Sequence, residues 1–180
     1  MHTDTPRSPE VDRLCELTNI GAGHAATAFA SLAGCPIRMD VPQVCGVAPA
    51  DAGARTTGIF FEVEGTFSAL LAIVFDASEC EAVAARMLGE RAGSLDAQTL
   101  ESVLTELGNI LASHVVSAIA DTVGGRVMPS VPHLVMGNAD RVLAERAAAR
   151  SPLCVESVLH DENGRLGGRL VLVPEAGSLR

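Results

Sequence analysis

The chain contains the stretch Asp12-Arg13-Leu14-Cys15-Glu16-Leu17-Thr18-Asn19-Ile20-Gly21 and, 90 positions later, the related stretch Ser102-Val103-Leu104-Thr105-Glu106-Leu107-Gly108-Asn109-Ile110-Leu111. The register continues beyond these stretches, because each of three later residues has its counterpart at the same offset: His24 and His114, Ala28 and Ala118, Pro42 and Pro132. Both copies fit the pattern Asp/Ser-x3-Glu-x2-Asn-x22-Pro. A repeat at one fixed offset indicates that the chain is built from two copies of one unit.

The same secondary-structure plan is expected in both halves. Apolar residues at helical spacing, followed by glycine, predict long helices over 9–33 and about 97–123. Strands are expected at 36–47, 57–64, 67–75, 126–135, 152–160 and 167–174, and shorter helices from Asp76 to about 89 and near 139–149.

The two halves are expected to form one unit. A half of ~80 residues would bury too small a core alone. We therefore expect a single domain over 1–180 with repeat halves of about 9–91 and 97–175. The expected fold class is α/β, more narrowly α+β, with pseudo-twofold symmetry and long paired helices packed on a mainly antiparallel β-sheet.

The repeated polar residues fall on one face of each predicted helix. At about 100° per residue, Asp12, Glu16 and Asn19 form a narrow stripe that Gly23 continues. The second helix builds the same stripe from Ser102, Glu106, Asn109 and Ser113. Leu14 and Ala25, like Leu104 and Val115, fall on other faces that are suited to packing.

Two interpretations of these stripes are open. One is a solvated helix face with an acidic residue near the helix N-terminus. The other is a site, because asparagine is a poor helix former and here recurs in mid-helix. An amide can hold a water molecule by donating and accepting hydrogen bonds, and a carboxylate beside it can pair with a partner's cation. Positioning a water is a known route to phosphoryl hydrolysis.

Composition excludes several other functions. The formal net charge is −9, which argues against a nucleic-acid surface, and aromatic residues make up only 3% of the chain. All 13 cations are arginine, so lysine Schiff-base chemistry and a P-loop lysine are absent. No apolar run approaches a membrane span of roughly 18 residues. The N-terminus, Met1 to Arg7, lacks a signal pattern. We therefore expect a cytoplasmic protein with no membrane partner.

The five cysteines are odd in number and show no C-x-x-C spacing. A zinc site or a disulfide framework is therefore not expected. The cysteines are predicted to be reduced, mostly buried thiols, and Cys15, on an apolar part of the first helix, is predicted to be inert rather than a nucleophile.

The motif residues carry a resemblance to a known family. The stretch from Glu16 to Ala28 resembles the first signature of the CheC-type chemotaxis phosphatases. The stretch from Glu106 to Ser113, followed by Met128-Pro-Ser-Val-Pro132, resembles their second signature. Two copies of the motif are more similar to CheC than to CheX, which has one such site per subunit; the FliY-type flagellar switch phosphatases share both sites.

The resemblance implies hydrolysis of the aspartyl-phosphate on the response regulator CheY. It implies that Asn19 and Asn109 position the attacking water, and that Glu16 and Glu106 pair with the regulator's lysine. Asp12 and Ser102 occupy the first position of the motif, and Pro42 and Pro132 are expected to shape the backbone. No cofactor or metal of its own is expected, because the magnesium ion would belong to CheY.

Two departures from the family pattern stand out. His24 occupies a position that is commonly Asn in the first signature; it and His114 are expected off the stripe, as ordinary helix-face histidines. The stretch Gly137-Asn138-Ala139-Asp140 replaces an Asp-Met-Ala-Gly-like stretch near the surface that docks the receptor deamidase CheD, which bears on CheD as a partner. The alternatives to a phosphatase are a non-catalytic module that binds phosphorylated CheY or regulates CheD, and a flagellar switch component related to FliM.

Overall fold

The computed structural model describes residues 8–46 and 55–179, in four helices and eight strands. In chain order these are α1 (Pro9–Ala33), β1 (Ile37–Met39), β2 (Gln43–Cys45), β3 (Thr56–Gly65), β4 (Ala69–Asp76), α2 (Ala77–Leu88), α3 (Ala97–Val123), β5 (Val127–Pro129), β6 (His133–Met136), α4 (Ala139–Ala148), β7 (Cys154–Asp161) and β8 (Gly167–Pro174).

The two long helices begin and end as predicted. The side chain of Ser8 accepts a hydrogen bond from a backbone N–H in the first turn of α1, and Asp96 does the same for α3. Gly34 ends α1 at φ 64° and Gly124 ends α3 at φ 67°, a left-handed conformation that favours glycine. The predicted helices over 9–33 and 97–123 are therefore confirmed.

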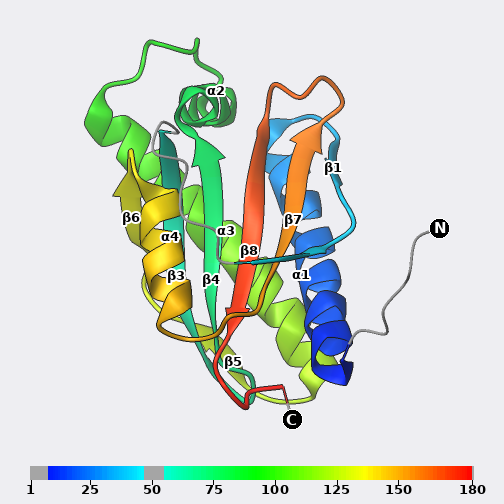
Figure 1. The fold of residues 1–180 in the computed structure, drawn as a ribbon. Helices are drawn as coiled ribbons and strands as arrows, with labels where there is room; N and C mark the ends of the chain where they lie inside the picture. The colour runs from blue at the N-terminus through cyan, green and yellow to red at the C-terminus, as the bar shows by residue number, and fades with distance from the viewer. Residues whose placement is uncertain (1–7, 47–54, 180) are drawn as a thin grey trace, which may run out of the picture.

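The eight strands form one antiparallel sheet in which the two halves of the chain are interleaved (Figure 1). The strand order is β1-β7-β8-β4-β3-β5, with β2 also beside β7 and β6 also beside β3. The short strands after α1 thus pair with the second half's hairpin, and those after α3 pair with the first half's hairpin. Strands β4 and β8 meet in the middle, where the halves join.

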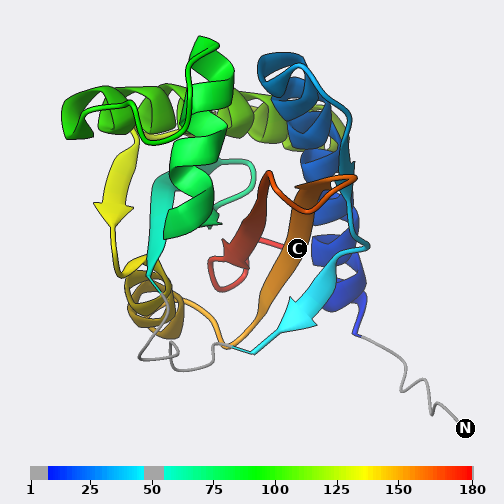
Figure 2. The same cartoon turned by 90° about the horizontal axis from the view of Figure 1, so that it is seen from above.

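Each face of the sheet has its own apolar cluster. On one face α1, α2 and α3 pack over Ile59, Phe61 and the neighbouring strands, and on the other face α4 packs over Phe60 (Figure 2). The residues assigned to packing faces, namely Leu14, Ala25, Leu104 and Val115, are all at most 1% exposed. The long paired helices on an antiparallel sheet are confirmed.

The helices α1 and α3 touch closely at Gly21. A Cβ on this residue would lie 2.9 Å from Cγ1 of Val115. The missing side chain therefore lets the two motif-bearing helices approach each other, which fixes the position of both motifs on the same face of the sheet.

Two of the predicted strands are broken. The expected strand at 36–47 is β1 and β2, and the one near 126–135 is β5 and β6; Val47 lies outside the described residues. Met39 pairs with Leu159 and Gln43 with Glu156, so three residues oppose two at the break. The second copy has the same three-against-two break between Pro129 and His133. Each break is a β-bulge, and it contains the motif proline, which has no N–H for the ladder.

The expectation of one plan for both halves is wrong in one respect. In the first half the helix α2 follows the hairpin β3–β4, whereas in the second half α4 precedes the hairpin β7–β8. The offset between equivalent strands accordingly grows from 90 positions for β1 and β5 to 98 for β4 and β8. The repeat is therefore strict over the motif helices and the bulges, and looser after them.

The expectation that all cysteines are reduced and mostly buried is also wrong. Cys45 on β2 and Cys154 on β7 form a disulfide, with Cα atoms 5.3 Å apart. They are 109 positions apart in the sequence, but the register of β2 and β7 places them directly opposite each other. Of the other described cysteines, Cys80 is buried, which raises the pKa of its thiol, and Cys15 and Cys35 are half-buried.

Among the described residues, α3 is long and apolar enough to cross a membrane by length and composition alone. Half of its most apolar window is buried inside the fold, and the helix packs against α1 and the sheet. A single helix of this kind is weak support for a membrane span, because the core helix of a globular fold has the same properties.

Candidate active site

The first motif lies on the outer face of α1. Asp12, Glu16 and Asn19 are all exposed, while Leu17 and Thr18 between them are buried against the core. The Thr18 hydroxyl donates a hydrogen bond of 2.8 Å to the Leu14 carbonyl, so a buried polar group is satisfied within the helix. The stripe predicted from helical spacing is therefore an exposed row on a rigid element.

The second motif lies on α3 in the equivalent place. Ser102 and Glu106 are exposed and Asn109 is half-buried. A shallow open hollow is lined by residues of this helix, namely Glu106, Asn109, Ile110, Ser113 and His114. The Ser113 hydroxyl donates a hydrogen bond of 2.7 Å to the backbone carbonyl of Asn109, so this bond does not occupy the Asn109 side-chain amide.

His114, which is expected off the stripe, borders the hollow at the second motif. It is exposed and lines the same hollow as Asn109 and Glu106. His24, its counterpart on α1, is also exposed.

The glutamates of the two motifs differ in their surroundings. Glu16 forms an ion pair with Arg13, one turn earlier, at 3.5 Å, with both side chains about half exposed (55% and 42%). The position equivalent to Arg13 is Val103, and Glu106 has no ion pair with any residue in 8–46 or 55–179. The carboxylate of Glu106 is thus open to a partner, whereas that of Glu16 has a competing arginine.

A close approach of backbone to sheet positions the second motif. Gly108 precedes Asn109 and is buried, and a Cβ on it would stand 2.6 Å from Cγ2 of Ile59 on β3. The first copy has Thr18 at this position, so α1 does not need the same approach. Only a glycine lets α3 lie this close to β3 without displacing Ile59.

The bulges that contain the motif prolines are fixed by hydrogen bonds to neighbouring strands. The Asp40 N–H donates to the Val158 carbonyl at 2.8 Å, and the Ser157 hydroxyl donates to the Asp40 carbonyl at 2.8 Å. In the second copy the Ser130 N–H donates to the Glu62 carbonyl at 2.7 Å, and the Glu62 N–H donates to the Ser130 hydroxyl oxygen at 3.0 Å. Asp40 and Ser130, two residues before the motif prolines, are therefore each bonded to the neighbouring strand.

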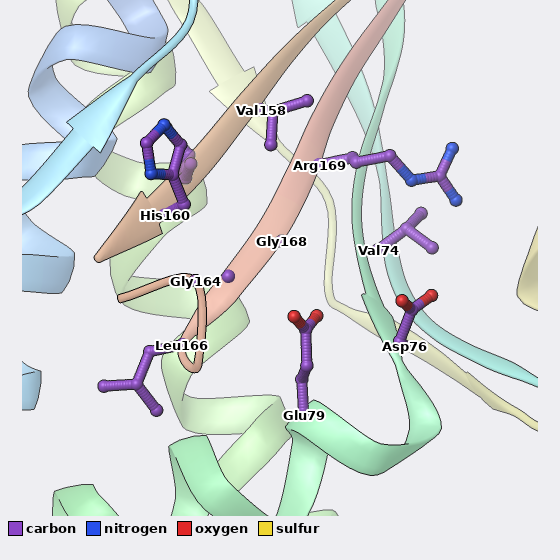
Figure 3. A pocket seen from close by; sticks show the side chains of 11 residues that line it. Val74, Asp76, Glu79, Val158, His160, Gly164, Leu166, Gly168 and Arg169 are labelled. Carbon is purple, nitrogen blue, oxygen red and sulfur yellow. The ribbon is translucent and has the colours of Figure 1, made fainter. Parts of the chain in front are cut away.

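A separate pocket of about 200 Å³ lies between the start of α2 and the hairpin β7–β8 (Figure 3). The carboxylate of Glu79 points toward β8 near Gly168, and that of Asp76 lies to its right in this view, below Arg169. Burial raises the pKa of Glu79, and the nearby charge of Asp76 raises it further. None of the motif residues lines this pocket. The repeated motif gives no sign of this pocket, because the pocket forms beside α2, where the two halves differ.

The segment from Gly137 to Asp140, which was considered for CheD docking, makes contacts within the fold. Ala139 is fully buried, and Asp140 pairs with Arg169 of β8, which also binds Glu156. Burial opposes the charge of Arg169, but hydrogen bonds and attraction from Asp140 and Glu156 outweigh it and raise the pKa of the guanidinium. Asp140 thus serves the contact between α4 and the sheet.

No group of three or more His, Cys, Asp or Glu side chains within residues 8–46 and 55–179 is arranged to hold a metal ion. Each stripe carries the side-chain amide of an asparagine and the exposed carboxylate of a glutamate. An amide can orient a water molecule, and a carboxylate can bind a cation. Neither group is a strong base or a nucleophile by itself.

Comparison with known proteins finds a family match for the two motif segments. The profile described as the CheC-like family matches residues 12–45 and 101–136, which are the two motif helices with their bulged strands. These two motif segments match the CheC-like family. Among curated proteins, this chain is 29% identical over 152 residues to the CheY-P phosphatase CheC of Bacillus subtilis (strain 168), covering 77% of this chain and 72% of that one.

Solved structures share the fold of this chain. Thermotoga maritima FliY matches with a TM-score of 0.70 and 18% identity, over 97% of this chain and 94% of that one. CheX of Borrelia burgdorferi, solved in a complex with CheY, BeF3 and Mg, matches with a TM-score of 0.68 and 14% identity, over 89% of this chain and 99% of that one. At these identities the likeness concerns the fold alone.

Proposed function

We propose that this protein is a phosphatase with two active sites that removes the phosphoryl group from the aspartyl-phosphate of a CheY-type response regulator. The observation that carries the proposal is the Glu–Asn pair that occurs at equivalent places on α1 and α3, with both glutamates exposed, Asn19 exposed and Asn109 half-buried. The named activity of the Bacillus relative and the CheY complex of the Borrelia structure support the choice of partner.

In this proposal Asn19 and Asn109 each orient a water for attack on the phosphorus atom. An asparagine side chain can accept a hydrogen bond from the water and donate one to a phosphoryl oxygen. Water attack breaks the bond between phosphorus and the aspartyl oxygen, releasing inorganic phosphate and the free carboxylate. Rate enhancement comes from positioning, which is the main contribution available in phosphoryl transfer.

The carboxylates of Glu16 and Glu106 bind the lysine of the regulator and fix the docking geometry. This chain has no lysine of its own, and its net charge of −9 favours a partner site that presents a cation. The regulator supplies the magnesium ion, so the phosphatase needs no metal site. Asp12 and Ser102, at the start of each stripe, extend the polar surface toward the partner. CheD remains a further proposed partner, and the cytoplasm the proposed location.

The test follows the decay of phosphate from a CheY-type regulator in the presence of the wild type, Asn19→Ala, Asn109→Ala and the double variant. Each single variant is expected to lose one site, and the double variant about 10²-fold or more of the activity. The exposed Asn163, in the β7–β8 turn, gives a matched control, Asn163→Ala, which should keep full activity. Tight binding of phosphorylated CheY without any change in phosphate lifetime would favour the non-catalytic adaptor instead.

A further inference from the structure

We infer that Val41 and Val131 are apolar docking contacts for the response regulator, one beside each active site; this inference rests on the proposed function. The two valines are 74% and 84% exposed, the largest exposures among the big apolar side chains of the described residues. Each one directly precedes the motif proline. A single exposed valine is ordinary, but equivalent valines in both copies are a shared feature of the two sites.

The valines are held in place rather than on loose loops. Each lies in a β-bulge, next to Asp40 or Ser130, whose backbone is hydrogen-bonded to the neighbouring strand. On the other side stands a proline, with its restricted φ. A side chain fixed in this way loses little conformational entropy when a partner covers it.

The bulge of the first copy lies alongside the first motif. Met39 lies beside Gly23, since its Sδ is 3.7 Å from where a Cβ on that glycine would stand. Strand β1 runs from the C-terminal end of α1 back toward its N-terminus (Figure 1). Two strand residues span about 6.6 Å, which equals roughly four residues along a helix. Val41 therefore lies at about the level of Asn19.

The same construction places Val131 beside the second motif. Strands β5 and β6 follow α3 at the same offset as β1 and β2 follow α1, and the bulge has the same three-against-two register. Each site then offers an amide, a carboxylate and a fixed apolar side chain. An apolar contact at the rim excludes water from the charged pair and increases affinity for the partner.

The occupant that this surface fits is the face of the regulator around its phosphorylated aspartate. The acidic stripe of each site binds the cation of that face, and the valine requires an apolar residue next to it. A second copy of this chain would bring an equally acidic surface to the contact, because the net charge is −9, and like charges oppose such pairing.

The test separates the two sites by disabling one at a time. Val41→Ala is made in the Asn109→Ala background, where the first site works alone, and Val131→Ala in the Asn19→Ala background. In these same-site backgrounds the KM for the phosphorylated regulator should rise about 3- to 10-fold with kcat unchanged, because removal of two buried methyl groups weakens binding. In the opposite backgrounds, Val41→Ala is combined with Asn19→Ala, and Val131→Ala with Asn109→Ala. There the substituted site is already inactive, so each valine substitution should leave KM and kcat unchanged.

Leu88→Ala is the matched control. Leu88 is an exposed apolar residue (47%) at the end of α2, outside both motifs, so its truncation should change neither KM nor kcat. Because the valines are exposed, their truncation should also leave the free energy of unfolding unchanged. An unchanged KM in the same-site background, an equal rise in both backgrounds, or a change in oligomeric state on truncation would overturn the inference.

A failure of the proposed function gives a different result. If the wild type does not shorten the phosphate lifetime, the catalytic proposal is wrong, and binding of beryllofluoride-activated regulator still tests the valines. A rise in Kd of about 3- to 10-fold for the Val41→Ala, Val131→Ala double variant would then support the docking surface. An unchanged Kd would overturn it.

Discussion

Substitution of Gly108 tests what positions the second motif on the sheet. A Cβ at this residue would stand 2.6 Å from Cγ2 and 3.0 Å from Cβ of Ile59. Ile59 is fully buried, so it has no open space into which to move. Gly108→Ala must therefore push α3 away from β3 or force Ile59 into a strained rotamer.

The magnitude follows from two opposing contributions. Overpacking a filled core costs about 1–3 kcal/mol, while alanine is favoured over glycine in a helix interior by about 1 kcal/mol. Gly108→Ala should thus lower the free energy of unfolding by up to about 2 kcal/mol. Because Asn109 is the next residue, activity of the second site, measured in the Asn19→Ala background, should fall as well.

Gly23 on α1 provides the matched comparison. It is also a mid-helix glycine, but within 4 Å a Cβ there would meet only Met39 Sδ, at an ordinary 3.7 Å. Gly23→Ala should raise the free energy of unfolding by about 0.5–1 kcal/mol. Urea unfolding of the two variants should differ by about 1–3 kcal/mol. If Gly108→Ala is as stable as Gly23→Ala, close packing at Gly108 does not set the position of α3.

Three further predictions concern charge, pH and the disulfide. Arg13→Ala frees Glu16 from an exposed ion pair and should lower the KM of the first site about 1.5- to 5-fold in the Asn109→Ala background; an unchanged KM would show that the pair does not compete with docking. The Asp161 carbonyl and the Asp40 carboxylate raise the pKa of His160 above its ordinary value. The protonated His160 therefore contributes fully to stability at a pH below the ordinary value, and this contribution is lost as the pH rises through the raised pKa. The difference in Tm between the wild type and His160→Gln should therefore shrink from about pH 6 to pH 8, and a difference that grows with pH would contradict the assigned contacts. Cys154→Ser, which opens the disulfide, should lower the free energy of unfolding by about 2–4 kcal/mol without reductant; equal stability of the two proteins would show that the bond does not constrain the chain.

The sequence was sufficient where the determinants are local. Helical spacing of the apolar residues, with Gly34 and Gly124 after them, predicted both long helices with their ends. The angle of 100° per residue also predicted that Glu16 and Glu106 would be exposed. These properties depend on neighbours within a few turns, which a sequence displays directly.

The sequence was insufficient where distant segments meet. The breaks at Pro42 and Pro132 depend on register with β7 and β3, and the disulfide from Cys45 depends on the same pairing. The pocket near Glu79 arises from the different placement of α2 and α4, which the 90-residue offset concealed. Each of these features is set by long-range strand pairing rather than by local pattern.

The most direct test of the central claim is the phosphate lifetime of the regulator in the presence of the Asn19→Ala, Asn109→Ala double variant. The variant is compared with Asn163→Ala at equal concentration, and both are checked for equal free energy of unfolding. The account predicts that the double variant restores the lifetime of the regulator alone, while Asn163→Ala shortens it as the wild type does. A double variant that shortens the lifetime as much as the wild type would contradict the account.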